Sequence, residues 1–185
     1  TKLGKELRDI LLHTHDEVSP RAEALLYAAD RAHHVETLIR PALERGEIVI
    51  TDRYLDSSIA YQGAGRVLSP GEVGRISRWA TESLIPTLTI IIDLPSEIGL
   101  GRLKSRDRLE RESLDFHERV RQEFLSMALL DPERYLVIDG RQSIDDLHLA
   151  IVDRVMELRD LNKIEKKPKV RKRIIKKPQL RKSAK

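Results

Sequence analysis

Three short apolar segments that alternate with helical patterns are the feature that most constrains the fold of this chain. Two are centred on Ile48-Val49-Ile50 and Ile90-Ile91-Ile92, and the third runs from Tyr135 to Asp139. Continuous apolar runs of this length favour strands that are buried on both faces. Such strands, separated by helices, are typical of a parallel sheet that helices cover. The pattern therefore predicts an α/β fold with strands at 48–50, 87–93 and 135–139.

Helix signals fill the intervals between the predicted strands. Ser19-Pro20 and Ser69-Pro70-Gly71-Glu72 each place a capping residue before a proline at the first helical position. Pro41 predicts a break or a kink in the second helix, and Gly46 predicts its C-terminal cap. The predicted helices run over 3–12, from Pro20 to about Ile39, from Pro70 to about Leu84, onward from Pro95-Ser96-Glu97, over 114–130 and onward from Ser143.

The composition excludes several classes of protein. The sequence contains no cysteine, which excludes a disulfide scaffold, a zinc finger and a thiol nucleophile. No apolar run approaches the roughly 20 residues of a membrane span, and the first residues lack the apolar core of a signal peptide. We therefore expect a soluble, cytoplasmic protein with no membrane contact. Trp79 and Phe116 are predicted to lie in its core.

Charge is distributed unevenly along the chain. Residues 163–185 hold 12 Lys or Arg and one acid, whereas residues 1–162 hold 22 Lys or Arg and 29 acids. The chain is accordingly divided into a domain over 1–162 and a basic tail over 163–185. The tail has little to bury and is expected to be disordered. It could contact nucleic acid or simply remain solvated, and it has no aromatic residue on which bases could stack.

The residues after the first predicted strand have the chemistry of a phosphate site. Ligands bind at the carboxyl ends of strands in open α/β sheets, and this strand ends in Thr51-Asp52-Arg53-Tyr54. An aspartate in this place can hold a metal ion, and an adjacent arginine can grip a phosphate with two hydrogen bonds. The hydroxyls, amide and glycines between Ser57 and Arg66 suit a loop around a small polar ligand. The alternative is a structural ion pair between Asp52 and Arg53 in an ordinary polar loop.

Several stretches of the sequence resemble bacterial thymidylate kinases in order and spacing. The most specific is Asp52-Arg53-Tyr54 followed by Ala60-Tyr61-Gln62-Gly63-Ala64-Gly65-Arg66. The stretch from Ser19 to Arg31 is similar to the nucleoside-binding helix of the family, and Asp107 to Arg121 looks like its lid and the next helix. The resemblance covers about residues 1–160. It implies the fold of P-loop nucleoside monophosphate kinases and phosphoryl transfer from ATP to dTMP with Mg²⁺, which gives dTDP for the biosynthesis of dTTP.

The resemblance implies a role for each residue that matches the family's dTMP site. Tyr27 matches the aromatic residue that stacks on thymine, and Arg31 matches the arginine that bonds the base. These two positions share a helix face, because they are four residues apart. Arg53 matches the residue that grips the dTMP phosphate, and Tyr61 matches the aromatic residue beneath the deoxyribose. Polar contacts to the nucleotide are implied for Ser58 and Gln62.

The resemblance also implies residues for the transfer step. Asp52 matches the acid near the metal ion and the transferring group. Arg102, Arg106 and Arg108 match lid arginines that stabilise charge on the transferring phosphoryl group. For each arginine the alternative is an ordinary solvated helix face. The implied partners are dTMP, ATP and a second copy of the chain in a homodimer.

One motif of the family is absent from these residues. The P-loop, G-x-x-x-x-G-K-[ST], cradles phosphates with backbone N–H groups and a lysine, and no such stretch occurs here. In the family it precedes the residues that Thr1 to Asp9 match. We therefore expect either a sequence without the N-terminal strands, P-loop and first helix, or a relative that has no P-loop. Without the central strand that carries this loop, residues 1–185 alone are expected to fold poorly and to have no kinase activity.

Two other functions stay open from the sequence. One is a nucleic-acid-associated protein that works through the basic tail, although the acidic charge of residues 1–162 argues against it. The other is a non-catalytic interaction protein derived from a kinase.

Overall fold

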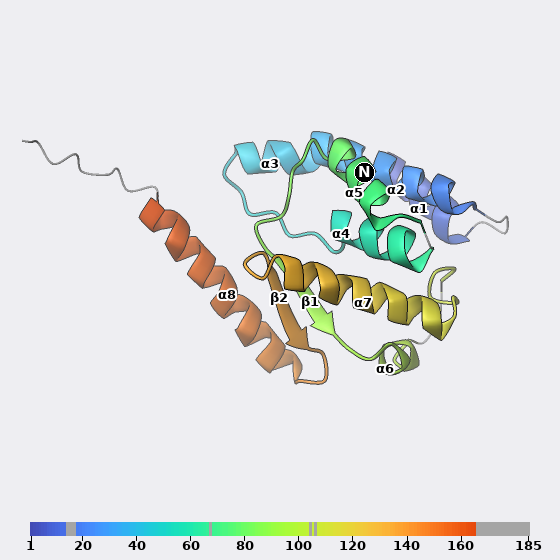
Figure 1. The fold of residues 1–185 in the computed structure, drawn as a ribbon. Coiled ribbons are helices and arrows are strands. Elements are labelled where there is room, and N and C mark those ends of the chain that lie inside the picture. The colour runs from blue at the N-terminus through green and yellow to red at the C-terminus, as the bar shows by residue number, and fades with distance from the viewer. Residues whose placement is uncertain (14–17, 67, 104, 106, 166–185) are drawn as a thin grey trace, which may run out of the picture.

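Helices dominate the part of the chain that the structure describes, and a parallel pair of strands lies among them (Figure 1). The computed structural model describes residues 1–13, 18–66, 68–103, 105 and 107–165. The elements in chain order are α1 (Lys2–His13), α2 (Pro20–His34), η1 (Val35–Ile39), α3 (Arg40–Glu44), α4 (Leu55–Ser58), η2 (Ile59–Gly65), α5 (Pro70–Ala80), β1 (Thr89–Asp93), α6 (Ser96–Gly101), α7 (Leu114–Leu130), β2 (Tyr135–Asp139) and α8 (Ile144–Glu165). The segments η1 and η2 are π-helical, with wider turns than an α-helix.

The sheet of the described residues consists of β1 and β2, which run parallel. Thr89 pairs with Tyr135 and Asp93 pairs with Asp139, so both strands end in an aspartate at the same edge. Helices α7 and α8 both contact β2 (Figure 1). The α/β class is confirmed, and so are the two strands predicted in this part of the chain, with β1 beginning two residues later than expected.

The prediction of a strand at 48–50 is wrong. These residues form no strand, and Ile48 is 79% exposed and Ile50 92% exposed. A strand needs partners for its backbone N–H and C=O groups, and the ladder that the described residues form is between β1 and β2. Without a partner strand, the apolar segment belongs to a connection without regular secondary structure between α3 and α4.

Capping residues begin two of the helices as predicted. The Oγ of Ser69 accepts a hydrogen bond of 3.4 Å from the backbone N–H of Glu72 at the start of α5, and the Oγ of Ser143 accepts one of 3.1 Å from Asp146 at the start of α8. Helix α5 ends at Ala80, four residues earlier than expected. The chain turns there through Glu82 and Ser83, whose φ angles are +48° and +57°.

The helix predicted from Pro20 continues through η1 and α3 to Glu44. The irregularity expected at Pro41 takes the form of the π-helical segment directly before it, rather than a break. Gly46 then ends the helix with a φ of +78°, a conformation that other residues rarely adopt. The backbone N–H of Glu47 donates to the carbonyl of Ala42 at 3.0 Å, so the predicted C-terminal cap is confirmed.

The described core is centred on η2, which packs between α5 and α7. Ala60 from η2 is fully buried against Phe116 and Val120 from α7, so the core position of Phe116 is confirmed. Glycine permits this close approach. A Cβ atom at Gly65 would lie 2.7 Å from the Phe116 ring, and one at Gly63 would lie 2.9 Å from the Cα of Pro70.

Trp79 does not lie in the core, and its prediction as a core residue is wrong. It is 83% exposed on α5, whereas Val73, Ser77 and Ala80 on the same helix are buried. At 100° per residue, Trp79 lies 200° around the helix axis from Ser77. Its size favours burial, but its position on the helix points it away from η2.

We expect Gly65→Ala to destabilise the fold by about 1–3 kcal/mol, because the new methyl group would overlap a buried ring. Gly101→Ala is the matched control, since a Cβ atom there would meet nothing within 4 Å. Urea unfolding followed by circular dichroism measures both free energies of unfolding. Equal stability of the two variants would contradict the close packing described here.

Candidate active site

Arg31 on α2 is one of the residues that join α2 to the segment after Tyr54. Its Nη2 donates a hydrogen bond of 3.0 Å to the Oγ of Ser58, which is 3% exposed. Its guanidinium lies 5.8 Å from the centre of the Tyr54 ring. Burial lowers the pKa of Arg31, and the nearby acid Asp30 and tyrosine Tyr54 oppose that shift. The Nη1 of Arg31 is buried and has no hydrogen-bond partner among the described residues, so it offers a donor to an acceptor from outside the chain.

Tyr27 lies one helical turn before Arg31 on the same face of α2. It is half-buried, and burial raises the pKa of its hydroxyl. The negative charge of Glu23 raises that pKa further, while the positive charges of Arg108 and Arg53 oppose it. Tyr27 therefore lies within the electrostatic reach of both arginines, although the sequence separates these three residues widely.

Arg53 has a backbone conformation that few side chains adopt. Its φ is +61°, in the left-handed region, which costs on the order of 1–3 kcal/mol for a residue other than glycine. The Oγ1 of Thr51 donates a hydrogen bond of 3.1 Å to the Arg53 carbonyl within this turn. The guanidinium of Arg53 lies 4.7 Å from the centre of the Tyr61 ring. The strained turn thus places Arg53 over a residue of η2.

Tyr61 and Gln62 of η2 lie against different neighbours. The Tyr61 ring packs edge-on against Phe116 and Phe124 of α7, with ring centres 6.1 and 6.4 Å apart. Gln62 is 2% exposed, and its Nε2 donates a hydrogen bond of 2.9 Å to Glu23 Oε1 on α2. The Tyr61 ring that lies next to Arg53 is thus also held by aromatic packing against α7.

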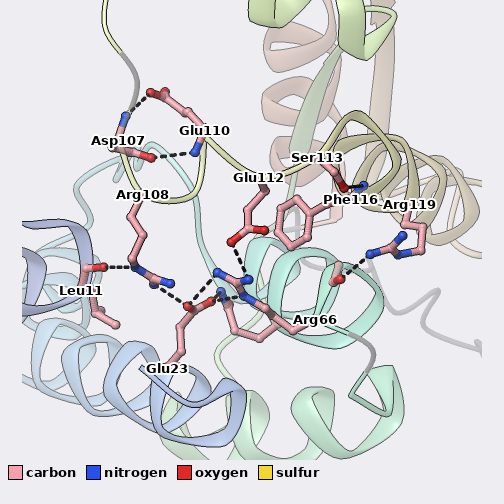
Figure 2. A network of polar contacts seen from close by, with 12 residues as sticks. Leu11, Glu23, Arg66, Asp107, Arg108, Glu110, Glu112, Ser113, Phe116 and Arg119 are labelled. Atoms are coloured by element: carbon pink, nitrogen blue, oxygen red, sulfur yellow. Dashed lines mark hydrogen bonds and ion pairs between the residues drawn. The ribbon is translucent and has the colours of Figure 1, made fainter. Parts of the chain in front are cut away.

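Arg108 is held by groups on α1 and α2 (Figure 2). Its Nε donates a hydrogen bond of 2.7 Å to the carbonyl of Leu11, and its Nη2 donates to Glu23 Oε2. Burial opposes the charge of Glu23, but donors from Gln62 and Arg108 and the charge of Arg66 hold the pKa of this carboxyl below its ordinary value. Glu23 was not predicted as a site residue. The sequence signal that could have indicated it is that Glu23 is an acidic residue among apolar residues of the predicted helix.

Of the three arginines expected in the lid, Arg102 and Arg108 do not lie together. Arg102 follows α6, and its Nη1 donates a hydrogen bond of 3.3 Å to the carbonyl of Gly140, directly after β2. Arg108 instead contacts α1 and α2. Arg106 lies outside the described residues.

A second buried carboxylate, Asp56, was also missed from the sequence. It is 3% exposed and accepts hydrogen bonds of 2.9 and 3.2 Å from Arg134, 2.8 Å from the Tyr135 hydroxyl and 3.1 Å from Thr89 Oγ1. Burial together with the charge of Asp56 raises the pKa of Tyr135. These bonds attach α4, and with it the turn at Arg53, to the beginnings of β1 and β2.

The described residues contain no cluster of three or more His, Asp or Glu side chains that could hold a metal ion by themselves. Asp52 is exposed beside Arg53, so its carboxylate is open to solvent. A single carboxylate of this kind suits Mg²⁺, which keeps several waters and shares its remaining positions with substrate phosphates. Among the described residues, no helix has both the length and the apolar character to span a membrane.

Comparisons with known proteins agree with one another. The family model described as thymidylate kinase matches residues 1–151. The thymidylate kinase of Clavibacter michiganensis subsp. michiganensis is 54% identical over 162 residues, which are 85% of this chain and 77% of that protein. That of Leifsonia xyli subsp. xyli is 56% identical over 155 residues, 82% of this chain and 73% of the relative. The crystal structure of thymidylate kinase from Ehrlichia chaffeensis matches with a TM-score of 0.66 at 27% identity, over 83% of this chain and 73% of that one.

We expect Asp56→Ala to lower the free energy of unfolding by about 3–5 kcal/mol, because it leaves the buried guanidinium of Arg134 without its main partner. Asp131→Ala is the matched control. It removes a half-exposed carboxylate from the same arginine and should cost less than about 1 kcal/mol. Chemical unfolding of both variants checks the difference, and equal losses would show that burial does not decide the strength of these pairs.

Proposed function

Since this chain belongs to the thymidylate kinase family, we propose that it transfers the terminal phosphoryl group of ATP to dTMP, giving dTDP and ADP. The family match over residues 1–151 is the observation that carries this conclusion. A kinase-derived interaction protein and a nucleic-acid-associated protein are not favoured by the comparisons. The site residues below are proposals that rest on the geometry of α2, η2 and the turn at Arg53.

In the proposed dTMP site, the base lies against Tyr27 and accepts a hydrogen bond from Arg31. The buried and unpartnered Nη1 of Arg31 supports this assignment, because a base edge would supply its missing acceptor. Ser58 orients the same guanidinium through its bond to Nη2. Gln62, whose amide nitrogen is bonded to Glu23, keeps its amide oxygen as an acceptor for the nucleotide.

The sugar of dTMP is assigned to Tyr61, and its phosphate is assigned to Arg53. The packing of Tyr61 against α7 gives it one fixed orientation beneath a deoxyribose. Arg53, which stacks on that ring, can turn its guanidinium toward a phosphate while its stem stays in place. A phosphate held this way brings the acceptor oxygen to a defined position for in-line transfer.

Three further residues are proposed for the transfer step itself. Asp52 would hold Mg²⁺, which neutralises charge on the phosphates and the transferring group. The contacts of Arg108 with described residues use its Nε and Nη2, which leaves Nη1 as a donor toward the phosphates. Arg102 and Arg106 stay candidates for the same role. The sequence of 185 residues contains no P-loop motif, so no residue is assigned to the backbone cradle that a P-loop forms around the ATP phosphates.

We propose that the protein is cytoplasmic and forms a homodimer, as the resemblance implies. Large exposed apolar side chains on the helices supply surface that a second copy could cover, and they include Ile10, Leu25, Leu38 and Trp79. Sedimentation velocity measures the oligomeric state, and a monomer at micromolar concentration would contradict this proposal. Contact of the basic tail with nucleic acid is a separate proposal, which would appear as binding that weakens steeply with salt.

We expect Arg31→Ala to weaken dTMP binding by about 10- to 100-fold, because a charged hydrogen bond to a base edge is worth roughly 1.5–3 kcal/mol. The matched control is Arg45→Ala, which changes an exposed arginine at the end of α3. Titration calorimetry with dTMP, on protein expressed from its own gene, measures both affinities. Equal losses in the two variants would contradict the assignment of Arg31 to the base.

We expect Arg53→Lys to raise KM for dTMP and to lower kcat, because lysine cannot form the two parallel bonds of a guanidinium with a phosphate. A coupled assay of ADP formation, on protein expressed from its own gene, measures both constants. The variant with wild-type kinetics would exclude Arg53 from the phosphate site.

A further inference from the structure

Glu23 carries a carboxylate in a position without any solvent contact. Its side chain is 0% exposed, and both oxygens accept hydrogen bonds (Figure 2). Oε1 accepts from Gln62 at 2.9 Å and from the Nε of Arg66 at 3.4 Å, and Oε2 accepts from Arg66 Nη2 at 3.3 Å and from Arg108. A buried charge is retained only when donors compensate it, so Glu23 depends on η2 and on Arg108.

The segment 107–112 is attached to this carboxylate at both of its ends. Arg108 donates to Glu23, and Glu112 accepts a hydrogen bond of 2.6 Å from Nη1 of Arg66, the arginine that also binds Glu23. Within the segment, Asp107 and Glu110 form two reciprocal bonds of 2.9 Å between each backbone N–H and the other's side chain. Two arginines and two glutamates therefore balance in charge and join segment 107–112 to α2 and η2.

The contact of α2 with α4 and η2, called the seam below, also carries the residues proposed to bind dTMP. Glu23, Tyr27 and Arg31 follow one another at intervals of one turn on α2. Across the seam, Gln62 of η2 bonds Glu23, and Ser58 of α4 bonds Arg31. The bonds that Glu23, Arg66, Arg108 and Glu112 form do not involve Tyr27 or Arg31, so they can be changed without touching these two base contacts.

We propose that Glu23 is a positioning residue, which holds Arg108 and the segment 107–112 in register with the helix that binds the monophosphate. This proposal rests on the proposed function only for its expected effect on kcat. Glu23 acts through Arg108 and Arg66 and does not itself touch the substrate. Glu23→Gln keeps a side-chain oxygen that can accept from Gln62, so the dTMP pocket should stay in place, while loss of the charge should free the segment that carries Arg108.

Glu23→Gln tests this proposal, with Glu36→Gln on the exposed face of η1 as the matched control. We expect amides of 107–112 to exchange hydrogen at least tenfold faster in Glu23→Gln, with exchange in β1 and β2 unchanged. We expect kcat to fall tenfold or more, while the dissociation constant of dTMP changes less than threefold. Glu23→Asp should restore part of kcat. Arg108→Met, which removes the same bond from the other side, should loosen the same amides.

Amide hydrogen exchange in 107–112 at the wild-type rate, in both Glu23→Gln and Arg108→Met, would overturn the proposal. A rise in exchange throughout the chain in both variants would also overturn it, because Glu23 would then serve overall stability. Failure of wild-type protein to bind dTMP would refute the proposed function alone. The local effect of Glu23→Gln on 107–112 would stand in that case.

Discussion

The contact of α2 with the segment α4–η2 is the constraint on which the candidate site depends. Two polar bonds fasten it, from Arg31 to Ser58 and from Gln62 to Glu23. They lie two helical turns apart on α2, and Tyr27 lies between them. Because each bond involves a buried group, a shift of α2 along η2 would leave a charge or an amide unsatisfied. The two elements are therefore held in one register.

The position of η2 is set in turn by packing from its other side. Glycines at 63 and 65 let its backbone approach α5 and the Phe116 ring closely, and aromatic side chains of α7 support Tyr61. Asp56 ties the preceding α4 to the beginnings of both strands. The strained turn at Arg53 is thus bounded by a fixed helix and a fixed sheet, which explains how the chain sustains a φ of +61° there.

Local signals in the sequence predicted the elements whose causes are local. Ser69 and Ser143 cap helices, and Gly46 ends one. The bounds of α7 follow from apolar periodicity, and those of β2 follow from a short apolar run. The prediction of a strand at 48–50 failed because a strand depends on a neighbour, which composition does not reveal. The prediction of Trp79 as a core residue was wrong for a related reason. Its size suggested burial, but its angular position on α5 leaves it exposed.

The candidate site likewise has residues that local spacing predicts and residues whose partners lie far away in the sequence. Tyr27 and Arg31 could be paired from their spacing, and the structure brings Arg53, Ser58 and Tyr61 to the same seam. The partners of Glu23 and Asp56 could not be predicted, because Arg108 and Arg134 are 85 and 78 residues away in the chain. Arg102 and Arg108 looked alike in sequence, yet one lies at the end of β2 and the other at α2.

A crystal structure of the protein with dTMP would show directly whether the contact between α2 and η2 binds this nucleotide. We expect the base against the Tyr27 ring, an acceptor of the base within hydrogen-bond distance of Arg31 Nη1, and the phosphate at Arg53. The nucleotide bound elsewhere, with Arg31 Nη1 still without a ligand, would contradict it.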